Sequence, residues 1–130
     1  MAYREFPVPP RWRDPVEAAW SAGVPADAPE VVQPILPDGC MDIVWTGTEL
    51  AVAGPDTTPH PFLRSPGRRS AGLRFAPGRL PALLGVPAAE LRDRRVPLAE
   101  LHPRIARAAA SRLTDAAADE RAVLDVLAAV

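Results

Sequence analysis

Short apolar runs separated by turn residues occupy the first 75 positions of the chain. These runs predict strands over residues 16–21, 31–36, 40–45, 50–53, 61–64 and 70–75. Glycine, proline and aspartate recur between the runs about every ten residues, a spacing typical of a small antiparallel barrel or sandwich. The 17 prolines agree with short strands, because proline ends helices and is excluded from central strands. Residues 1–15 are predicted to form an extended arm, because their prolines restrict the backbone.

The segment 36–45 has the clearest strand pattern, with the sequence Leu-Pro-Asp-Gly-Cys-Met-Asp-Ile-Val-Trp. Its proline, aspartate and glycine predict a turn before the strand. Alternation in the strand predicts Met41, Ile43 and Trp45 on one face, and Cys40, Asp42 and Val44 on the other. Because both faces carry apolar side chains, the pattern predicts burial on both sides or an occupied cavity.

Helical patterns replace the strand patterns after Phe75. Short helices are predicted over residues 79–84, 87–92 and 98–101, the first ended by Gly85 and the second begun by Pro87. A longer helix beginning at Pro103 has one apolar stripe, made of Ile105, Ala108, Ala109 and Leu113. A last helix capped by Asp119 has another, made of Val123, Leu124, Leu127 and Val130. The chain is therefore predicted to be α+β, with a β domain over residues 1–97 and a helical segment over 98–130.

Composition and charge limit the classes of protein to which this chain can belong. The formal net charge is −1, so there is no general positive field with which this segment would grip nucleic acid. All 15 basic residues are arginine, which we attribute to coding bias. A single cysteine cannot form an internal disulfide. The first residues lack the apolar core of a signal peptide, and no apolar run approaches the roughly 18 residues that cross a membrane. We therefore expect a cytoplasmic location and no membrane partner.

Several motifs in fixed order resemble one family. They are Tyr3-Arg-Glu-Phe6, a tryptophan at position 20, Leu36-Pro-Asp-Gly-Cys-Met-Asp-Ile-Val-Trp45, Val52-Ala-Gly-Pro-Asp-Thr57, Gly72-Leu-Arg-Phe-Ala-Pro-Gly78, Leu83-Leu-Gly-Val-Pro87 and Val96-Pro-Leu98. Together they resemble the N-terminal sensor domain of AraC-type helix-turn-helix transcriptional regulators. The motifs cover most of residues 3–101.

The resemblance implies a cupin-like β-barrel that binds an effector, followed by helices that contribute to a homodimer. In such regulators a carboxy-terminal module with two helix-turn-helix motifs reads DNA. That module is absent from this chain, so contact with DNA is expected only through a separate C-terminal domain. The candidate dimerisation residues are Ile105, Val123, Leu124 and Leu127.

Enzymatic chemistry has weak support in the sequence. Thiol chemistry needs a cation or a helix N-terminus beside the sulfur, whereas Cys40 lies between Asp38 and Asp42. The chain has two histidines, His60 and His102, without the close spacing of a zinc site. There is no serine or cysteine triad pattern and no glycine-rich phosphate loop. We therefore expect no catalysis, no metal and no cofactor.

An effector pocket is the better supported kind of site, because small-molecule sites are mainly apolar with a few converging polar groups. Trp20, Trp45 and Phe75 are candidate apolar walls. Arg74 is placed to meet an anionic effector bidentately, although alternation also allows it to face solvent. The candidate pocket residues are Trp20, Asp38, Cys40, Trp45, His60, Arg74 and Phe75. The alternative interpretation of the tryptophans is that they belong to the core.

The leading hypothesis is a non-catalytic effector-sensing and dimerisation domain, in which an unknown small-molecule effector shifts the population of two arrangements. Residues 1–15 are the predicted responsive element, because such an arm has little regular hydrogen bonding to lose. One alternative is a small cupin-type metal-binding protein or enzyme. Another is a dimerisation module with no ligand.

Overall fold

The structure is a computed structural model, and it describes residues 2–8, 10, 15–24, 26–27, 29–37, 39–46, 49–64, 67 and 69–116. Six strands form one antiparallel sheet, in the order β1 (Ala2–Phe6), β2 (Val16–Gly23), β7 (Arg69–Phe75), β4 (Met41–Trp45), β5 (Leu50–Ala53) and β8 (Arg95–Pro97). A separate antiparallel pair joins β3 (Val31–Ile35) to β6 (His60–Arg64).

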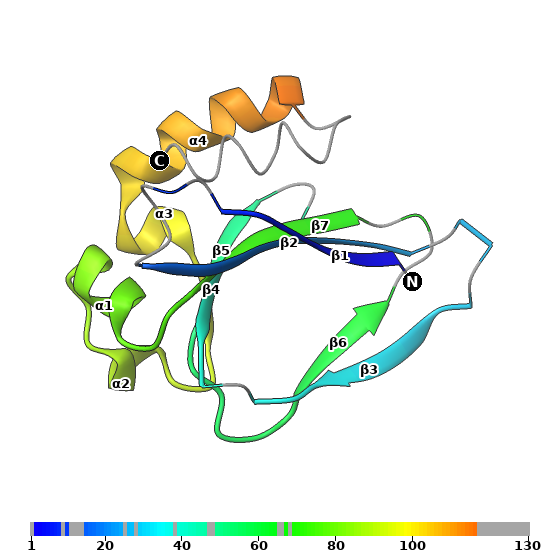
Figure 1. Cartoon of the computed structure of the whole chain (residues 1–130), viewed down its shortest axis with the longest axis horizontal. Helices are drawn as coiled ribbons and strands as arrows, with labels where there is room; N and C mark the ends of the chain where they lie inside the picture. Colours follow the sequence, from blue (N-terminus) through cyan, green and yellow to red (C-terminus); the bar gives the residue numbers. More distant parts are fainter. Residues whose placement is uncertain are drawn as a thin grey trace.

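In the described part of the chain four helices follow β7, with β8 between the second and the third. They are α1 (Arg79–Leu84), α2 (Ala88–Leu91), α3 (Leu98–Leu101) and α4 (Pro103–Ala116). In Figure 1, α3 and α4 lie on one side of β1, β2 and β7, and the β3–β6 pair lies on the other side, below the sheet in this view. The sheet therefore has a helix side and a ribbon side.

The core lies between the sheet and the helices. On β4, Met41, Ile43 and Trp45 are buried and pair in register with Phe75, Leu73 and Ala71 of β7. Buried helix residues belong to the same cluster, namely Leu80, Leu84, Leu91, Leu98, Ala106 and Ala109. Residues of both predicted segments, 1–97 and 98–130, thus contribute to one core.

The predicted α+β class is confirmed, and the six strands predicted from the apolar runs are present within one or two residues of their predicted ends. The six-stranded sheet is open rather than closed into a barrel, since β1 and β8 are its edges. Beyond the end of β4, the Thr46 backbone N donates a hydrogen bond of 3.0 Å to the Glu49 carbonyl, next to the start of β5.

The predicted arm over residues 1–15 is wrong in its first part. Ala2–Phe6 is a regular edge strand, paired residue for residue with the stretch of β2 from Ala19 to Gly23. A segment paired in this way has main-chain hydrogen bonds to lose, so it lacks the property on which its predicted responsiveness was based. The short strand β8 was not predicted at all, and α2 is shorter than the predicted helix over 87–92.

Candidate functional site

The ribbon side of the sheet carries polar and aromatic side chains among small ones. Asp42 of β4 pairs in register with Arg74 of β7. Trp20 of β2 lies between Gly72 of β7 and Glu5 of β1. Trp20, Asp42 and Arg74 are half-buried, whereas the helix-side residues of the same strands are buried. We call Glu5, Trp20, Asp42 and Arg74 the polar-face cluster.

The indole of Trp20 is fixed at two points. Its Nε1 donates a hydrogen bond of 2.9 Å to Oδ2 of Asp42. Its six-membered ring lies over Gly72, because a Cβ placed on that glycine would be 2.6 Å from Cζ2 and 2.7 Å from Cε2 of Trp20. Only a residue without a Cβ leaves room for the ring against the strand, so Gly72 and Asp42 together hold the indole over the sheet.

Arg74 has a carboxylate partner on the edge strand. Its Nη1 lies 3.5 Å from Oε1 of Glu5, and the side chains of Arg74 and Glu5 are 23% and 54% exposed. An ion pair that is long and accessible to water contributes little stability. The contact places Glu5 beside the guanidinium, but this ion pair is weak.

Cys40 immediately precedes β4 and lies close to a carboxylate. Its Sγ donates a hydrogen bond of 3.5 Å to Oε2 of Glu17. A negative group beside the sulfur is the opposite of the cationic surroundings that activate thiols. The group that Cys40 contacts here is thus an anion and not a cation.

The structure divides the predicted pocket residues between two places. Trp20 and Arg74 lie together on the ribbon side. Trp45 and Phe75 lie in the core on the helix side, so they do not share a wall with Arg74. The physical reason is alternation: Arg74 and Phe75 are neighbours on one strand and must point to opposite faces.

The remaining predicted site residues are placed as follows. His60 is the first residue of β6 rather than a loop residue, and its side chain is outside what the structure describes. Asp38, Val123, Leu124 and Leu127 lie outside the described residues. Ile105 of α4 is half-buried and packs against the core of its own chain. Part of the Ile105 side chain is therefore used within its own domain, and its predicted part in a dimer stays a prediction.

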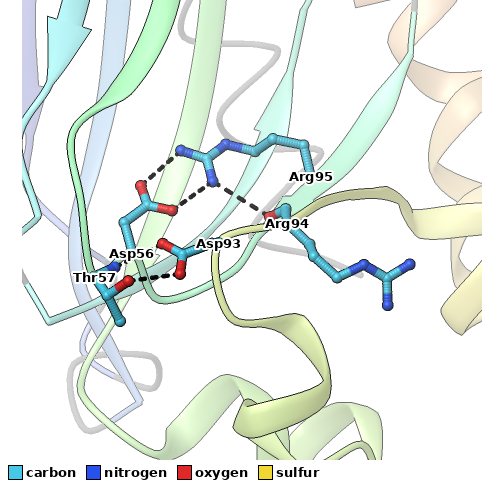
Figure 2. Close-up of polar contacts among 5 residues, drawn as sticks. All are labelled: Asp56, Thr57, Asp93, Arg94 and Arg95. Carbon is cyan, nitrogen blue, oxygen red and sulfur yellow. Dashed lines mark hydrogen bonds and ion pairs between the residues drawn. The ribbon is translucent and has the colours of Figure 1, made fainter.

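A second polar cluster lies at one end of the sheet and links the loop after β5 to the connection before β8 (Figure 2). Arg95 pairs with Asp56 through two contacts of 2.9 Å, and the Asp56 side chain is only 9% exposed. Thr57 donates to Asp93 twice, from its Oγ1 at 2.6 Å and from its backbone N at 2.7 Å. The hydroxyl bond first, and the backbone bond second, lower the pKa of the Asp93 carboxyl.

Main-chain contacts make the same link rigid. Gly54 N donates to the Arg94 carbonyl and Asp93 N donates to the Pro55 carbonyl, at 3.0 and 2.9 Å. A Cβ on Gly54 would lie 1.7 Å from the Leu91 carbonyl oxygen, so this close approach excludes every other residue. Gly54, Pro55 and Asp56 were predicted as turn residues, and the side chains of Asp56 and Thr57 also join two segments of the chain. We call Asp56, Thr57, Asp93 and Arg95 the clamp.

Metal binding has no support in the part of the chain whose side chains are described. There, no group of three or more histidine, cysteine, aspartate or glutamate side chains has a geometry that would hold an ion. His102 is instead a helix cap, because its Nδ1 accepts a hydrogen bond of 3.3 Å from the Ile105 backbone N at the start of α4.

The polar-face cluster contains two residues that sequence reasoning did not select, Glu5 and Asp42. Alternation placed Asp42 on the Cys40 face, but its bond to Trp20 depends on the order β2-β7-β4 in the sheet. Glu5 reaches Arg74 across β2 from a segment that was predicted to be an arm. No local signal in the sequence gives either contact.

The fold and site define a small α+β domain with an open antiparallel sheet and a polar face that its helices leave uncovered. The chain belongs to the family described as "Domain of unknown function (DUF6597)", whose family model matches residues 4–97. Comparison with curated proteins and with solved structures gives no match. No helix in the described part of the chain is both long and apolar enough to span a membrane.

Proposed function

We propose that this chain is the effector-sensing and dimerisation domain of an AraC-type transcriptional regulator, with a cupin-like β domain and no catalytic activity. The proposal rests on the ordered motifs between residues 3 and 101 and on one structural observation. That observation is the polar-face cluster, which places a held indole and a guanidinium on a sheet face that remains half-exposed.

The cluster fits a ligand site better than a structural one. A side chain that serves only the core is buried among apolar neighbours, as Trp45 is. Trp20 is half-buried instead and is held by a carboxylate and a glycine. Small-molecule sites combine an apolar wall with a few converging polar groups, and the indole and Arg74 supply one of each.

In the proposed mechanism, an effector binds one arrangement of the domain more tightly than another and so shifts their populations. In a dimer, this changes the spacing of two attached DNA-binding modules. The domain binds the effector without altering it, so its residues need only recognise and hold a ligand.

The first test joins the chain to a DNA-binding module that is inactive as a monomer and measures repression of a reporter gene. Repression that depends on the chain supports dimerisation. An effector response that Arg74→Gln removes, and that Arg107→Gln on the exposed side of α4 retains, supports sensing. Failure to repress, combined with a monomeric mass in sedimentation, would contradict the proposal.

Two other outcomes of the same study support other functions. Stoichiometric metal in the purified protein, lost on Cys40→Ala or His60→Ala, would favour a cupin-type metal-binding protein or enzyme. A stable dimer that represses but responds to no compound in a thermal-shift screen would favour a dimerisation module without a ligand.

A further inference from the structure

We infer that His102 is a pH-sensitive cap between α3 and α4, whose neutral ring holds the first turn of α4 and whose protonated ring releases it. The inference goes beyond the sensing function proposed above and does not depend on it. It rests on the atom of the ring that accepts a hydrogen bond, and on the backbone bonds of His102 itself.

His102 occupies the junction of two helices that follow one another directly (Figure 1). Its backbone N donates a hydrogen bond of 2.8 Å to the Leu98 carbonyl and so closes α3. Its own carbonyl accepts a hydrogen bond of 3.1 Å from the Ala106 backbone N, which is the bond that an N-cap residue makes to its helix. A change at this one residue therefore acts on both helices.

The ring of His102 supplies the acceptor for a backbone donor at the start of α4. Pro103, the first residue of the helix, has no N–H to satisfy. The Ile105 backbone N donates to Nδ1 of His102 at 3.3 Å, as a backbone N–H in the first turn does to an N-cap side chain. Serine, threonine and asparagine fill this role without a change of charge, whereas a histidine makes the cap depend on pH.

The direction of this bond determines the protonation of the ring. A backbone N–H can only donate, so Nδ1 carries a lone pair and the single ring proton is on Nε2. A proton taken up from water adds to Nδ1, and both ring nitrogens are then donors. Nδ1–H would face the Ile105 N–H, and the positive ring would lie at the helix end where the helix dipole disfavours cations. Histidine side chains change their charge between about pH 5 and pH 8, so mild acid is enough to release the cap.

The charged side chains of the surrounding elements are named here for their effect on the ring. α4 packs on α3, and α3 also contacts β5 and β8. α3 carries Glu100, and positions 103–109 of α4 carry Arg104 and Arg107, all three exposed. Leu50–Ala53 of β5 has no titratable side chain, and Arg95 of β8 pairs with Asp56. Glu100 favours protonation and the two arginines of α4 oppose it, while salt screens these exposed charges. The cap bond is therefore the interaction that distinguishes the neutral ring from the charged one.

Release of the cap changes the packing of α4. Ile105 is half-buried against the core, whereas Leu98 of α3 is fully buried in it. Unwinding the first turn of α4 withdraws Ile105 from this contact and leaves α3 in place. The junction thus converts a change in pH into a change in how α4 is held on the domain.

The first test is a pH titration of the whole chain followed by NMR, from about pH 8 to about pH 5.5. At the upper end we expect the proton of the His102 ring on Nε2. As the ring takes up its second proton, the Ile105 amide signal should move with it. The hydrogen-exchange protection of this amide should fall about fivefold, the factor that corresponds to the loss of one N-cap bond. A ring proton on Nδ1 at about pH 8, or an Ile105 amide that does not follow the ring, would overturn the inference.

Urea denaturation of variants then separates the cap from other effects of acid. His102→Asn keeps an uncharged acceptor at the N-cap. Between about pH 8 and about pH 5.5, the unfolding equilibrium constant of the wild type should therefore rise about fivefold relative to that of His102→Asn. Two matched controls retain His102 and should keep the wild-type response. Glu100→Gln removes the exposed carboxylate of α3, and His60→Gln removes the other histidine of the chain. Equal responses of the wild type and His102→Asn, or a response that His60→Gln abolishes, would contradict the pH-sensitive cap.

Discussion

The two faces of the main sheet are made by the same strands, yet they differ in how completely they are covered. On the helix side, Met41, Ile43 and Trp45 of β4 pack with residues of β7 and of the helices into one buried cluster. On the ribbon side, Asp42 and Val44 of the same strand remain half-buried. One face thus contains the buried core, and the other carries side chains that remain partly accessible to solvent.

This difference explains why the strand over residues 40–45 looks apolar on both faces. A strand covered on both sides reads as a nearly continuous apolar run. Here one face is covered by helices, and the other combines Val44 with the polar side chain of Asp42. Burial is thus confirmed for the face of Met41, Ile43 and Trp45, whereas the face of Asp42 and Val44 is partly exposed, and the alternative of an occupied cavity stays a prediction.

The largest effect is expected from a cavity in the buried core on the helix side of the sheet. Leu98 of α3 is fully buried, and α3 contacts both β5 and β8. We expect Leu98→Ala to lower the free energy of unfolding by about 3 kcal/mol, because the substitution leaves a cavity that the helix cannot fill. Urea denaturation measures the change. Leu83→Ala is the control, since Leu83 is 52% exposed and its truncation should cost less than about 1 kcal/mol. Equal costs would contradict the assignment of the core.

The next largest effect is expected at Gly72, which lies against the ring of Trp20. A Cβ at Gly72 would lie 2.6 Å from Trp20 and 2.8 Å from the Ile43 carbonyl oxygen. We expect Gly72→Ala to destabilise the protein by about 2 kcal/mol through crowding and to change the fluorescence of Trp20. Gly23→Ala on β2 is the matched control, because its Cβ would meet only Arg69 Cγ at 3.9 Å. An unchanged stability for Gly72→Ala would show that the indole is not held over the strand.

A smaller effect is expected within the polar-face cluster. Trp20→Phe removes the donor to Asp42, and Asp42→Asn weakens the acceptor. Each should cost about 1 kcal/mol, the usual value for one hydrogen bond at a partly solvated position. The double variant should cost less than the sum, because both substitutions act on the same bond. Additive costs in urea denaturation would show that the two side chains act independently.

Sequence patterns predicted the strands but not which elements would cover each face of the sheet. Alternation grouped Met41, Ile43 and Trp45 correctly, yet it is silent on where helices pack, so Trp45 and Phe75 were predicted as pocket walls. The edge strand β1 was missed because prolines follow it, while its strand structure comes from pairing with β2. Such pairing depends on tertiary context more than on local preference.

Contacts between distant positions were the least predictable part of the site. Arg74 and Glu5 are 69 residues apart, and Thr57 and Asp93 are 36 apart. Each contact requires the strand order and the path of a loop, and neither is encoded by local spacing. Gly54, Pro55 and Asp56 were therefore predicted only as turn residues, and the pairing of Asp56 with Arg95 was not predicted.

The smallest effect concerns the clamp, which lies outside the polar-face cluster and should change neither its ligand binding nor the packing of the core. The Thr57 hydroxyl, and then its backbone N, lower the pKa of Asp93 in the folded chain. As the pH falls, the unfolded chain therefore takes up the proton first. The stabilisation is present above the unfolded pKa, about 3.9 for aspartate, and is lost as the pH falls through the lower folded value.

We therefore expect Asp93→Asn to reduce stability slightly at neutral pH and to flatten the loss of stability in acid. Urea midpoints measured from neutral pH down to below the unfolded pKa give both quantities. Thr57→Val removes the hydroxyl donor and keeps the backbone N, so its acid dependence should lie between those of the wild type and Asp93→Asn. Parallel pH profiles for the three proteins would mean that Asp93 contributes no linked stability, and the clamp would then depend on Arg95, Asp56 and the main-chain bonds of Gly54.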